Sequence, residues 1–192
     1  MDVRSRNLEN SIGTTNSTTG DFDEWPAADG TGASGFHDRT GRTVGLARRD
    51  ELTTEDVKEL VEMYAEFDPP GGAHGLPPVR ESRIREWLDA LSIGFHALGR
   101  HRGRVVGHAV LVPTDEAAFE LAIFVHQDYR HAGIGTRILT EVLAMAVDRD
   151  VPEVRLYVEH SNDAAIGLYE SVGFEGEVVG PGELEMRLSL PA

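Results

Sequence analysis

The segment Arg130–Gly135 (RHAGIG) places an arginine and two glycines between an apolar run and a run with helical spacing. Glycine lacks a Cβ, so backbone N–H groups in such a turn can come close to a ligand. The N-terminus of the following helix adds about half a positive charge, which favours an anion. Arg130 and Arg137 flank the turn and can supply further positive charge. The spacing therefore predicts a phosphate-binding turn, although two glycines before a helix also occur in turns that bind no ligand.

The pattern differs from two common nucleotide-binding motifs. Dinucleotide-binding folds carry G-x-G-x-x-G after their first strand, with an acidic residue about 20 positions later. P-loop proteins need Gly-Lys-Ser/Thr at the start of the helix, and that triplet is absent here. The turn in this chain reads Arg-x-x-Gly-x-Gly and comes late in the sequence, so neither class is indicated.

The elements around the turn follow from hydrophobic spacing and punctuation. Alternating or continuous apolar runs predict strands over 43–48, 95–99, 104–112, 119–125, 153–158, 177–179 and 183–188. Helical spacing predicts helices that begin at Thr53 or Thr54, near Ser82, at Gly133 and at Asp163. The order β-α-α-β-β-β-α-β-α-β-β predicts an α/β fold with one mixed sheet and helices packed on it.

The first 40 residues have a different composition. Ser, Thr, Gly, Asn and Asp dominate, and the few apolar residues have no period. Such a segment buries too little apolar surface to offset the entropy of ordering it. We therefore expect a disordered, acidic and polar tail over 1–40 and a single domain over 41–192.

A second motif lies in the segment 162–174. Its positions are occupied by Asn162, Ala165, Leu168, Tyr169, Gly173 and Phe174. Together the two motifs resemble the GNAT superfamily of acyl-CoA-dependent N-acyltransferases. Its hallmarks are Gln/Arg-x-x-Gly-x-Gly/Ala between the fourth strand and the third helix, and Asn-x-x-Ala-x-x-Leu/Phe-Tyr-x-x-x-Gly-Phe later in the chain. The resemblance covers about residues 42–190 and implies a mostly antiparallel central sheet, splayed between family strands 4 and 5, with helices on both faces.

The resemblance also implies where coenzyme A binds. Backbone amides of the glycine turn would hold its pyrophosphate, and the backbone of the strand 119–125 would pair with its pantetheine arm like an added strand. The implied cofactor-binding residues are Ile123, Phe124, Val125, Arg130, His131, Ala132, Gly133, Ile134, Gly135, Thr136, Asn162, Ala165 and Tyr169. Acetyl-CoA is thus the expected co-substrate. No grouping of histidines and carboxylates has metal-ligand spacing, so no metal is expected.

Two residues are implied to carry the chemistry. An amine acceptor is protonated at neutral pH and must lose a proton before it attacks a thioester. Glu120 resembles the general base of many family members, and strand alternation puts it on the same face as Ala122 and Phe124. A carboxyl in a half-apolar cleft has a raised pKa, which suits a base, and the alternative is a solvated carboxylate at a strand end. Tyr169 is implied to protonate the leaving thiolate.

Three histidines are lesser candidates. His126 follows the strand 119–125 and could shuttle protons, although a surface position is the simpler interpretation. His131 lies inside the glycine turn, and we expect its side chain to point outward. His74 lies in a loop rich in glycine and proline, where either a contact with the acceptor or a flexible linker would explain it.

The composition excludes several classes of function. The chain has 192 residues, 18 Lys+Arg and 33 Asp+Glu, for a net charge of −15. This charge argues against electrostatic binding to nucleic acid or to anionic membranes. The sequence has no cysteine, no apolar run long enough to span a membrane and no apolar signal segment near Met1, so we expect a cytoplasmic location. Many carboxylates with a single lysine also resemble the composition of proteins from halophilic organisms.

The leading hypothesis is an N-acetyltransferase that moves an acetyl group from acetyl-CoA to a primary amine by direct attack. The amine could belong to a protein lysine, a protein N-terminus or a small molecule. The alternative is a non-catalytic module that binds or senses acyl-CoA. Domains of the family are often dimeric, so a homodimer is among the expected assemblies.

Overall fold

The computed structural model describes residues 33–67, 77–78, 80–114 and 118–191. Its centre is an eight-stranded sheet with the order β1-β2-β3-β4-β5-β6-β8-β7. The strands are β1 (Ala33–His37), β2 (Thr43–Arg49), β3 (Phe95–His101), β4 (Arg104–Pro113), β5 (Phe119–Val125), β6 (Glu153–Glu159), β7 (Glu175–Gly180) and β8 (Glu183–Ser189). The helices are α1 (Thr54–Ala65), α2 (Glu81–Ala90), α3 (Ile134–Val147) and α4 (Asp163–Glu170), and a short 3-10 helix spans Gln127–Tyr129.

The pairing of β5 with β6 makes the sheet a mixed one. It is parallel, whereas the other neighbouring strands pair in antiparallel fashion. Its register holds only Phe119 opposite Val154 and Glu120 opposite Arg155, so the two strands separate after the start of β5. The predicted mixed sheet, splayed at this position, is confirmed.

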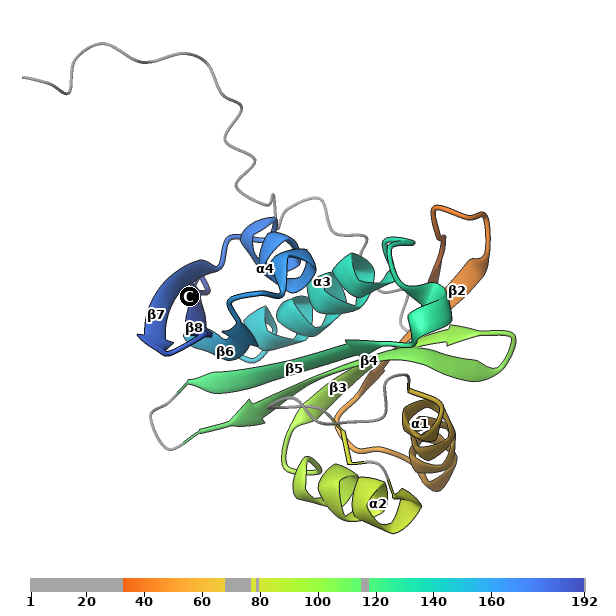
Figure 1. Cartoon of the computed structure of the whole chain (residues 1–192). Helices are drawn as coiled ribbons and strands as arrows, with labels where there is room; N and C mark the ends of the chain where they lie inside the picture. Colours follow the sequence, from red (N-terminus) through yellow and green to blue (C-terminus); the bar gives the residue numbers. More distant parts are fainter. Residues whose placement is uncertain (1–32, 68–76, 79, 115–117, 192) are drawn as a thin grey trace, which may run out of the picture.

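Two helical layers cover the sheet on opposite faces (Figure 1). Helices α1 and α2 lie on one face, and α3 and α4 lie on the other. The larger core joins α3 to alternate residues of the strands and includes Ile134, Ile138, Leu139, Val142 and Leu143. The smaller core joins α1 and α2 to Leu98 and Val105 and includes Leu60, Met63, Tyr64, Ile84 and Leu88. Strand alternation therefore sends Ile123 and Val125 toward α3, and Phe124 toward α1.

Two glycines let α3 approach the sheet closely. A Cβ added at Gly99 would lie 2.8 Å from Cδ1 of Ile138, and one added at Gly107 would overlap the same atom. Ile138 is fully buried. The close approach holds the N-terminal half of α3 against β3 and β4.

The sheet begins earlier than the sequence predicts. Strand β1 pairs with β2 over Ala33–His37, inside the segment that we expect to be a tail. Because β1 is an edge strand joined to β2 by backbone hydrogen bonds, it needs no periodic apolar pattern, and the boundary at residue 41 comes too late. The rest of the predicted tail, residues 1–32, lies outside the described residues.

No helix among the residues described in the structure is long and apolar enough to cross a membrane.

Candidate functional site

The glycine turn lies between the end of β5 and the start of α3. Gly133 is the residue before the helix and has φ +85°, which L side chains rarely adopt. His131 also has a positive φ, 58°, and its side chain is exposed, as the sequence predicts. These two left-handed residues turn the chain sharply from the strand edge into the axis of α3.

The N-terminus of α3 differs from those of the other described α-helices. Helix α1 has a capping box and two acidic residues in its first turn, α2 has Glu81, and α4 has Asp163 and the cap Asn162. Helix α3 has neither a side-chain cap nor an acidic residue in its first turn. Its first backbone N–H groups have no partner within the helix. In a chain with a net charge of −15, this end of α3 is left open to an external anion.

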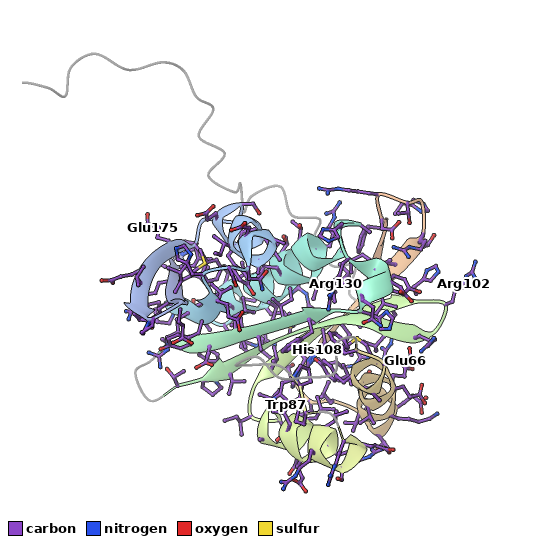
Figure 2. All side chains as sticks on the ribbon, viewed as in Figure 1. Glu66, Trp87, Arg102, His108, Arg130 and Glu175 are labelled. Carbon is purple, nitrogen blue, oxygen red and sulfur yellow. The ribbon has the colours of Figure 1, made fainter. Side chains whose placement is uncertain are left out.

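The two arginines predicted to flank the turn have other contacts. Nε of Arg130 donates to the carbonyl oxygen of Val125 at 3.1 Å, and its guanidinium lies 5.8 Å from the centre of the Phe67 ring. The guanidinium of Arg137 lies 5.4 Å from the centre of the Phe36 ring. Figure 2 shows Arg130 at the end of the molecule where the turn enters α3. Both charges stay near the turn, but neither head group is free of protein contacts.

The turn between β1 and β2 lies beside the glycine turn, where the sequence predicts no site residue (Figure 1). The backbone N–H of Arg39 donates to the carbonyl oxygen of Ala132 at 3.0 Å. Arg42 donates to the carbonyl oxygen of Asp128 at 3.1 Å, and its guanidinium lies 4.2 Å from the centre of the Tyr129 ring. The run from Asp38 to Gly41 contains turn-forming residues, which is the signal that could have revealed this hairpin.

The two sequence motifs meet in the folded chain. A Cβ added at Gly135 would lie 3.5 Å from both Leu168 of α4 and Val125 of β5. Because Gly135 has no side chain, α4 and the end of β5 can both pack against the start of α3 at this position. Asn162 caps α4 by accepting a hydrogen bond from the backbone N–H of Ala165 at 3.2 Å. This cap gives Asn162 a structural role beside the cofactor contact predicted from the sequence.

Tyr169 of α4 is buried and packs on Phe174, with the ring centres 5.8 Å apart. Burial raises the pKa of its phenol to about 12. The side chain is therefore a neutral hydroxyl donor across the physiological pH range.

Glu120 lies near the start of β5, opposite Arg155 of β6, where the two strands still pair. Its side chain is exposed rather than set in a half-apolar cleft. Tyr157 of β6 lies close enough to be affected by its charge. Burial, the hydrogen bond to Glu185 and the charges of Glu185 and Glu120 all act to raise the pKa of Tyr157. Glu120 is on the α1 and α2 face of the sheet, the face of Phe124, as strand alternation predicts.

A buried polar chain on the same face was not anticipated from the sequence. The hydroxyl of Tyr64 lies 2.6 Å from Nδ1 of His108, and Nε2 of His108 lies 3.0 Å from Nδ1 of His96. Burial lowers the pKa of His108, and it lowers the pKa of His96 to about 4, so both imidazoles are neutral at pH 7. Figure 2 shows His108 between the sheet and Trp87 of α2. Both histidines occupy inward positions of their strands, which is the signal that could have revealed them.

The aromatic side chains around this polar chain line the same face. The ring of Tyr64 lies 5.5 Å from Phe67, 5.3 Å from Trp87 and 5.5 Å from Phe124, between ring centres. Phe124 lies four residues beyond Glu120 on the same face of β5, so the aromatic cluster of Tyr64, Phe67, Trp87 and Phe124 and the predicted base share this face of the sheet.

Two of the lesser candidates from the sequence are His126 and His74. The predicted surface position of His126 is wrong, because the side chain is buried. Its Nδ1 accepts from the N–H of Asp128 at 3.3 Å, and its Nε2 lies 3.4 Å from Glu66. His74 lies outside the described residues. Among the residues that are described, no group of three histidines, aspartates or glutamates could hold a metal ion.

Comparison with known proteins identifies this arrangement. Residues 57–174, more than half of the chain, match the acetyltransferase (GNAT) family. This chain belongs to the GNAT family. Members of the family are acyltransferases that use acetyl-CoA as co-substrate, and the open N-terminus of α3 in this GNAT chain fits the phosphates of such a ligand.

Curated relatives of this GNAT chain have different acceptors in their names. The mycothiol acetyltransferase of Corynebacterium aurimucosum is 32% identical over 136 residues, which cover 66% of this chain and 44% of the relative. The mycothiol acetyltransferase of Thermomonospora curvata is 34% identical, over 55% of this chain and 35% of the relative. This chain thus spans less than half of the length of these two relatives. The N-alpha-acetyltransferase MAK3 of Arabidopsis thaliana is 27% identical, over 65% of this chain and 73% of the relative.

Solved structures of GNAT proteins share the fold. The GNAT domain of S. lividans PAT has a TM-score of 0.66 and 15% identity, over 87% of this chain and 100% of that one. The ribosomal-protein-alanine N-acetyltransferase of Brucella melitensis has a TM-score of 0.60 and 25% identity, over 74% of this chain and 99% of that one. The PaiA N-acetyltransferase of Thermoplasma acidophilum, solved in complex with coenzyme A, has a TM-score of 0.61 and 20% identity, over 76% of this chain and 99% of that one.

Proposed function

We propose that this GNAT protein transfers the acetyl group of acetyl-CoA to a primary amine by direct attack of the amine on the thioester. The observation that carries the proposal is the meeting of the glycine turn, the end of β5 and helix α4 around Gly135. This junction lies beyond the point where β5 and β6 stop pairing. The N-terminus of α3 is uncapped there, and this edge of β5 has no strand partner among the described residues of β6.

The residues present fit acetyl-CoA. The backbone N–H groups from His131 to Thr136 surround the uncapped start of α3 and would hold the diphosphate. Beyond Glu120, the described residues of β6 do not pair with β5, which leaves the backbone of Ile123 and the N–H of Val125 available to the amides of the pantetheine arm. The backbone of Phe124 faces β4 instead, and the carbonyl oxygen of Val125 already accepts from Arg130. When bound, acetyl-CoA supplies the activated acyl group and a good leaving group.

The protein's own groups would handle the two protons of the reaction. Glu120 carries an exposed carboxylate on the acceptor face of β5 and would accept the proton of the attacking amine. Tyr169 holds a neutral hydroxyl, because its pKa is about 12, and would donate its proton to the departing thiolate. The sequence contains no cysteine, which agrees with transfer that involves no acylated thiol on the enzyme.

The aromatic cluster of Tyr64, Phe67, Trp87 and Phe124 supports an acceptor site on the α1 and α2 side of the gap. Aromatic faces attract ammonium groups and pack against apolar side chains, so both small amines and peptide amines suit such a surface. The names of the relatives include mycothiol, N-alpha and ribosomal-protein-alanine acetylation. We therefore propose a primary amine as the acceptor and leave protein amines and small molecules as the two classes to compare.

The decisive experiment measures thiol release from acetyl-CoA against a panel of peptides with free N-termini, lysine peptides and small amines. Glu120→Gln should reduce turnover on the best acceptor by about 10²–10⁴, the usual contribution of a general base. Its affinity for coenzyme A should match the wild type, because Glu120 is predicted to face the acceptor rather than the cofactor. Glu159→Gln is the matched control, because Glu159 is an exposed glutamate of the neighbouring strand β6.

Two results would contradict the proposal. Unchanged turnover in Glu120→Gln would remove Glu120 from the mechanism. A wild-type protein that binds acetyl-CoA and acetylates no member of the panel would favour the alternative, a module that binds or senses acyl-CoA.

A further inference from the structure

We propose that Arg39, in the turn between β1 and β2, binds the diphosphate of coenzyme A and completes the site formed by the start of α3. This inference rests on the proposed function, because it assumes that the glycine turn receives the cofactor. It adds a residue from outside both sequence motifs and outside the residues 57–174 that match the family.

The position of Arg39 is set by its contact with the glycine turn. Its backbone N–H donates to the carbonyl oxygen of Ala132 at 3.0 Å, immediately before Gly133. A Cβ added at Gly133 would lie 3.6 Å from Nε and 3.8 Å from Cγ of Arg39. The side chain of Arg39 therefore lies alongside the residue that begins α3, and its guanidinium is within reach of a ligand on the amides that follow.

The turn that carries Arg39 is held rigidly. Asp38 is buried and accepts hydrogen bonds from the backbone N–H groups of Thr40 and Arg42, both at 2.9 Å, and from Nε of Arg42 at 2.7 Å. Burial acts to raise the pKa of Asp38, but these hydrogen bonds outweigh it and hold the pKa well below its usual range. Arg42 in turn binds the carbonyl of Asp128, so the turn is tied at both ends to the segment that precedes α3.

No carboxylate among the described residues forms an ion pair with Arg39. Arg42, Arg48, Arg49, Arg100 and Arg149 each form an ion pair with a carboxylate. Within the described part of the chain, Arg39 forms none, and its side chain is exposed.

A positive guanidinium beside the positive end of α3 is unfavourable unless an anion lies between them. A diphosphate carries at least two negative charges and offers several acceptor oxygens to the guanidinium and to the backbone amides together. The diphosphate is favoured over the 3′-phosphate as the partner of Arg39. Arg39 contacts Gly133 itself, and the amides that follow Gly133 are those expected to hold the diphosphate.

The test is calorimetric titration of the full chain with coenzyme A and with dephospho-coenzyme A, which lacks only the 3′-phosphate. Arg39→Gln should weaken binding of both ligands about tenfold or more, the usual effect of losing a charge-assisted hydrogen bond. Arg39→Lys should recover part of the affinity for both. Arg83→Gln is the matched control, because it removes one exposed arginine from α2 on the other side of the sheet.

Each outcome is decisive. Equal loss with both ligands supports the diphosphate contact. Loss with coenzyme A alone overturns it in favour of the 3′-phosphate, and unchanged affinity for both ligands in Arg39→Gln overturns any phosphate contact by Arg39. A wild-type protein that binds neither ligand overturns the proposed function as well, which separates the two failures. The unfolding temperature of Arg39→Gln should equal that of the wild type. This equality would show that the substitution leaves β1 paired with β2.

Discussion

At the scale of single residues, the environment of each group determines its chemistry. Tyr169 is buried against Phe174 and its pKa is raised to about 12, whereas Glu120 is exposed on the opposite face of the sheet. The two groups come from different sides of the sheet, because Tyr169 belongs to α4 and Glu120 to the face that Phe124 shares with α1. The proposed acid on one side of the β5–β6 gap and the proposed base on the other would suit a reaction in which cofactor and acceptor enter from opposite faces.

Removing only the hydroxyl of Tyr169 tests its role. Tyr169→Phe should lower kcat by about 10²-fold, the low end of the range for general acid catalysis, because a thiolate already leaves readily. The KM for acetyl-CoA should change little, and the unfolding temperature should stay close to the wild type, because the ring still packs on Phe174. Steady-state kinetics with the best acceptor would measure this effect. An unchanged kcat would mean that solvent protonates the thiolate.

At the scale of elements, the site depends on how α3 begins. Gly133 adopts a φ of +85° without strain and leaves the first amides of the helix uncapped. Gly99 and Gly107 let the same helix lie close to β3 and β4. Small residues thus determine both where the helix starts and how deep it packs.

A matched pair of glycine substitutions separates backbone strain from ligand binding. Gly133→Ala and Gly182→Ala each place a methyl group on a residue with positive φ, at +85° and +81° respectively. Each should cost about 1 kcal/mol of folding free energy, measured by urea unfolding. Only Gly133→Ala should also weaken coenzyme A binding, by several-fold, because the turn and Arg39 would shift. If Gly133→Ala bound coenzyme A as tightly as Gly182→Ala does, the glycine turn would not be the phosphate site.

At the scale of the whole molecule, the buried carboxylate of Asp56 joins three elements of the fold, α1, β2 and β3. Asp56 closes the capping box of α1 and forms ion pairs with Arg49 of β2, at 2.9 Å, and Arg100 of β3, at 2.7 Å. Burial acts to raise its pKa, but the hydrogen bonds from Arg100, Thr53 and Arg49 outweigh it, and the pKa is lowered. The first helix is therefore held to the sheet by charge as well as by the smaller core.

Removing that charge should destabilise the entire domain. Asp56→Asn should lower the free energy of unfolding by about 3 kcal/mol, because two arginines lose their buried partner. A lowered carboxyl pKa contributes stability above its unfolded value, near pH 4, and this contribution is lost as the pH falls toward the folded value. Wild-type stability should thus fall in acid, and the variant should show a flatter profile in urea unfolding between pH 7 and pH 2.5.

The control for this prediction is Asp50→Asn. Asp50 also pairs with an arginine, Arg149, but its side chain is 75% exposed, so its loss should cost less than about 1 kcal/mol. Equal losses in the two variants would show that the Asp56 network contributes no more than a surface ion pair.

Much of the fold and part of the site were predictable from local patterns. Apolar spacing located the strands from β2 to β8 and the helices α1 to α4 to within a few residues, and the predicted start of α1 at Thr53 or Thr54 includes the observed cap, Thr53. The positions of Gly133 and Gly135 predicted the turn, because a positive φ and a close approach of the backbone both favour glycine. The face of Glu120 followed from the period of a strand.

Contacts between distant segments were not predictable in this way. Strand β1 has no periodic pattern of its own, because pairing with β2 supplies its hydrogen bonds, and so Arg39 went unnoticed beside Gly133. The buried polar chain of Tyr64, His108 and His96 joins α1, β4 and β3, so its members come together only when the helix covers the strands.

The sequence alone thus determined which elements form, in what order, and which backbone positions need glycine, because these depend on interactions within a few residues. Only the folded structure determined which distant segments lie next to each other. It separated β5 from β6 after Glu120, turned the head group of Arg130 to Val125 and placed Arg39 at the start of α3. These arrangements depend on the packing of segments that are far apart in the chain, which no local pattern records.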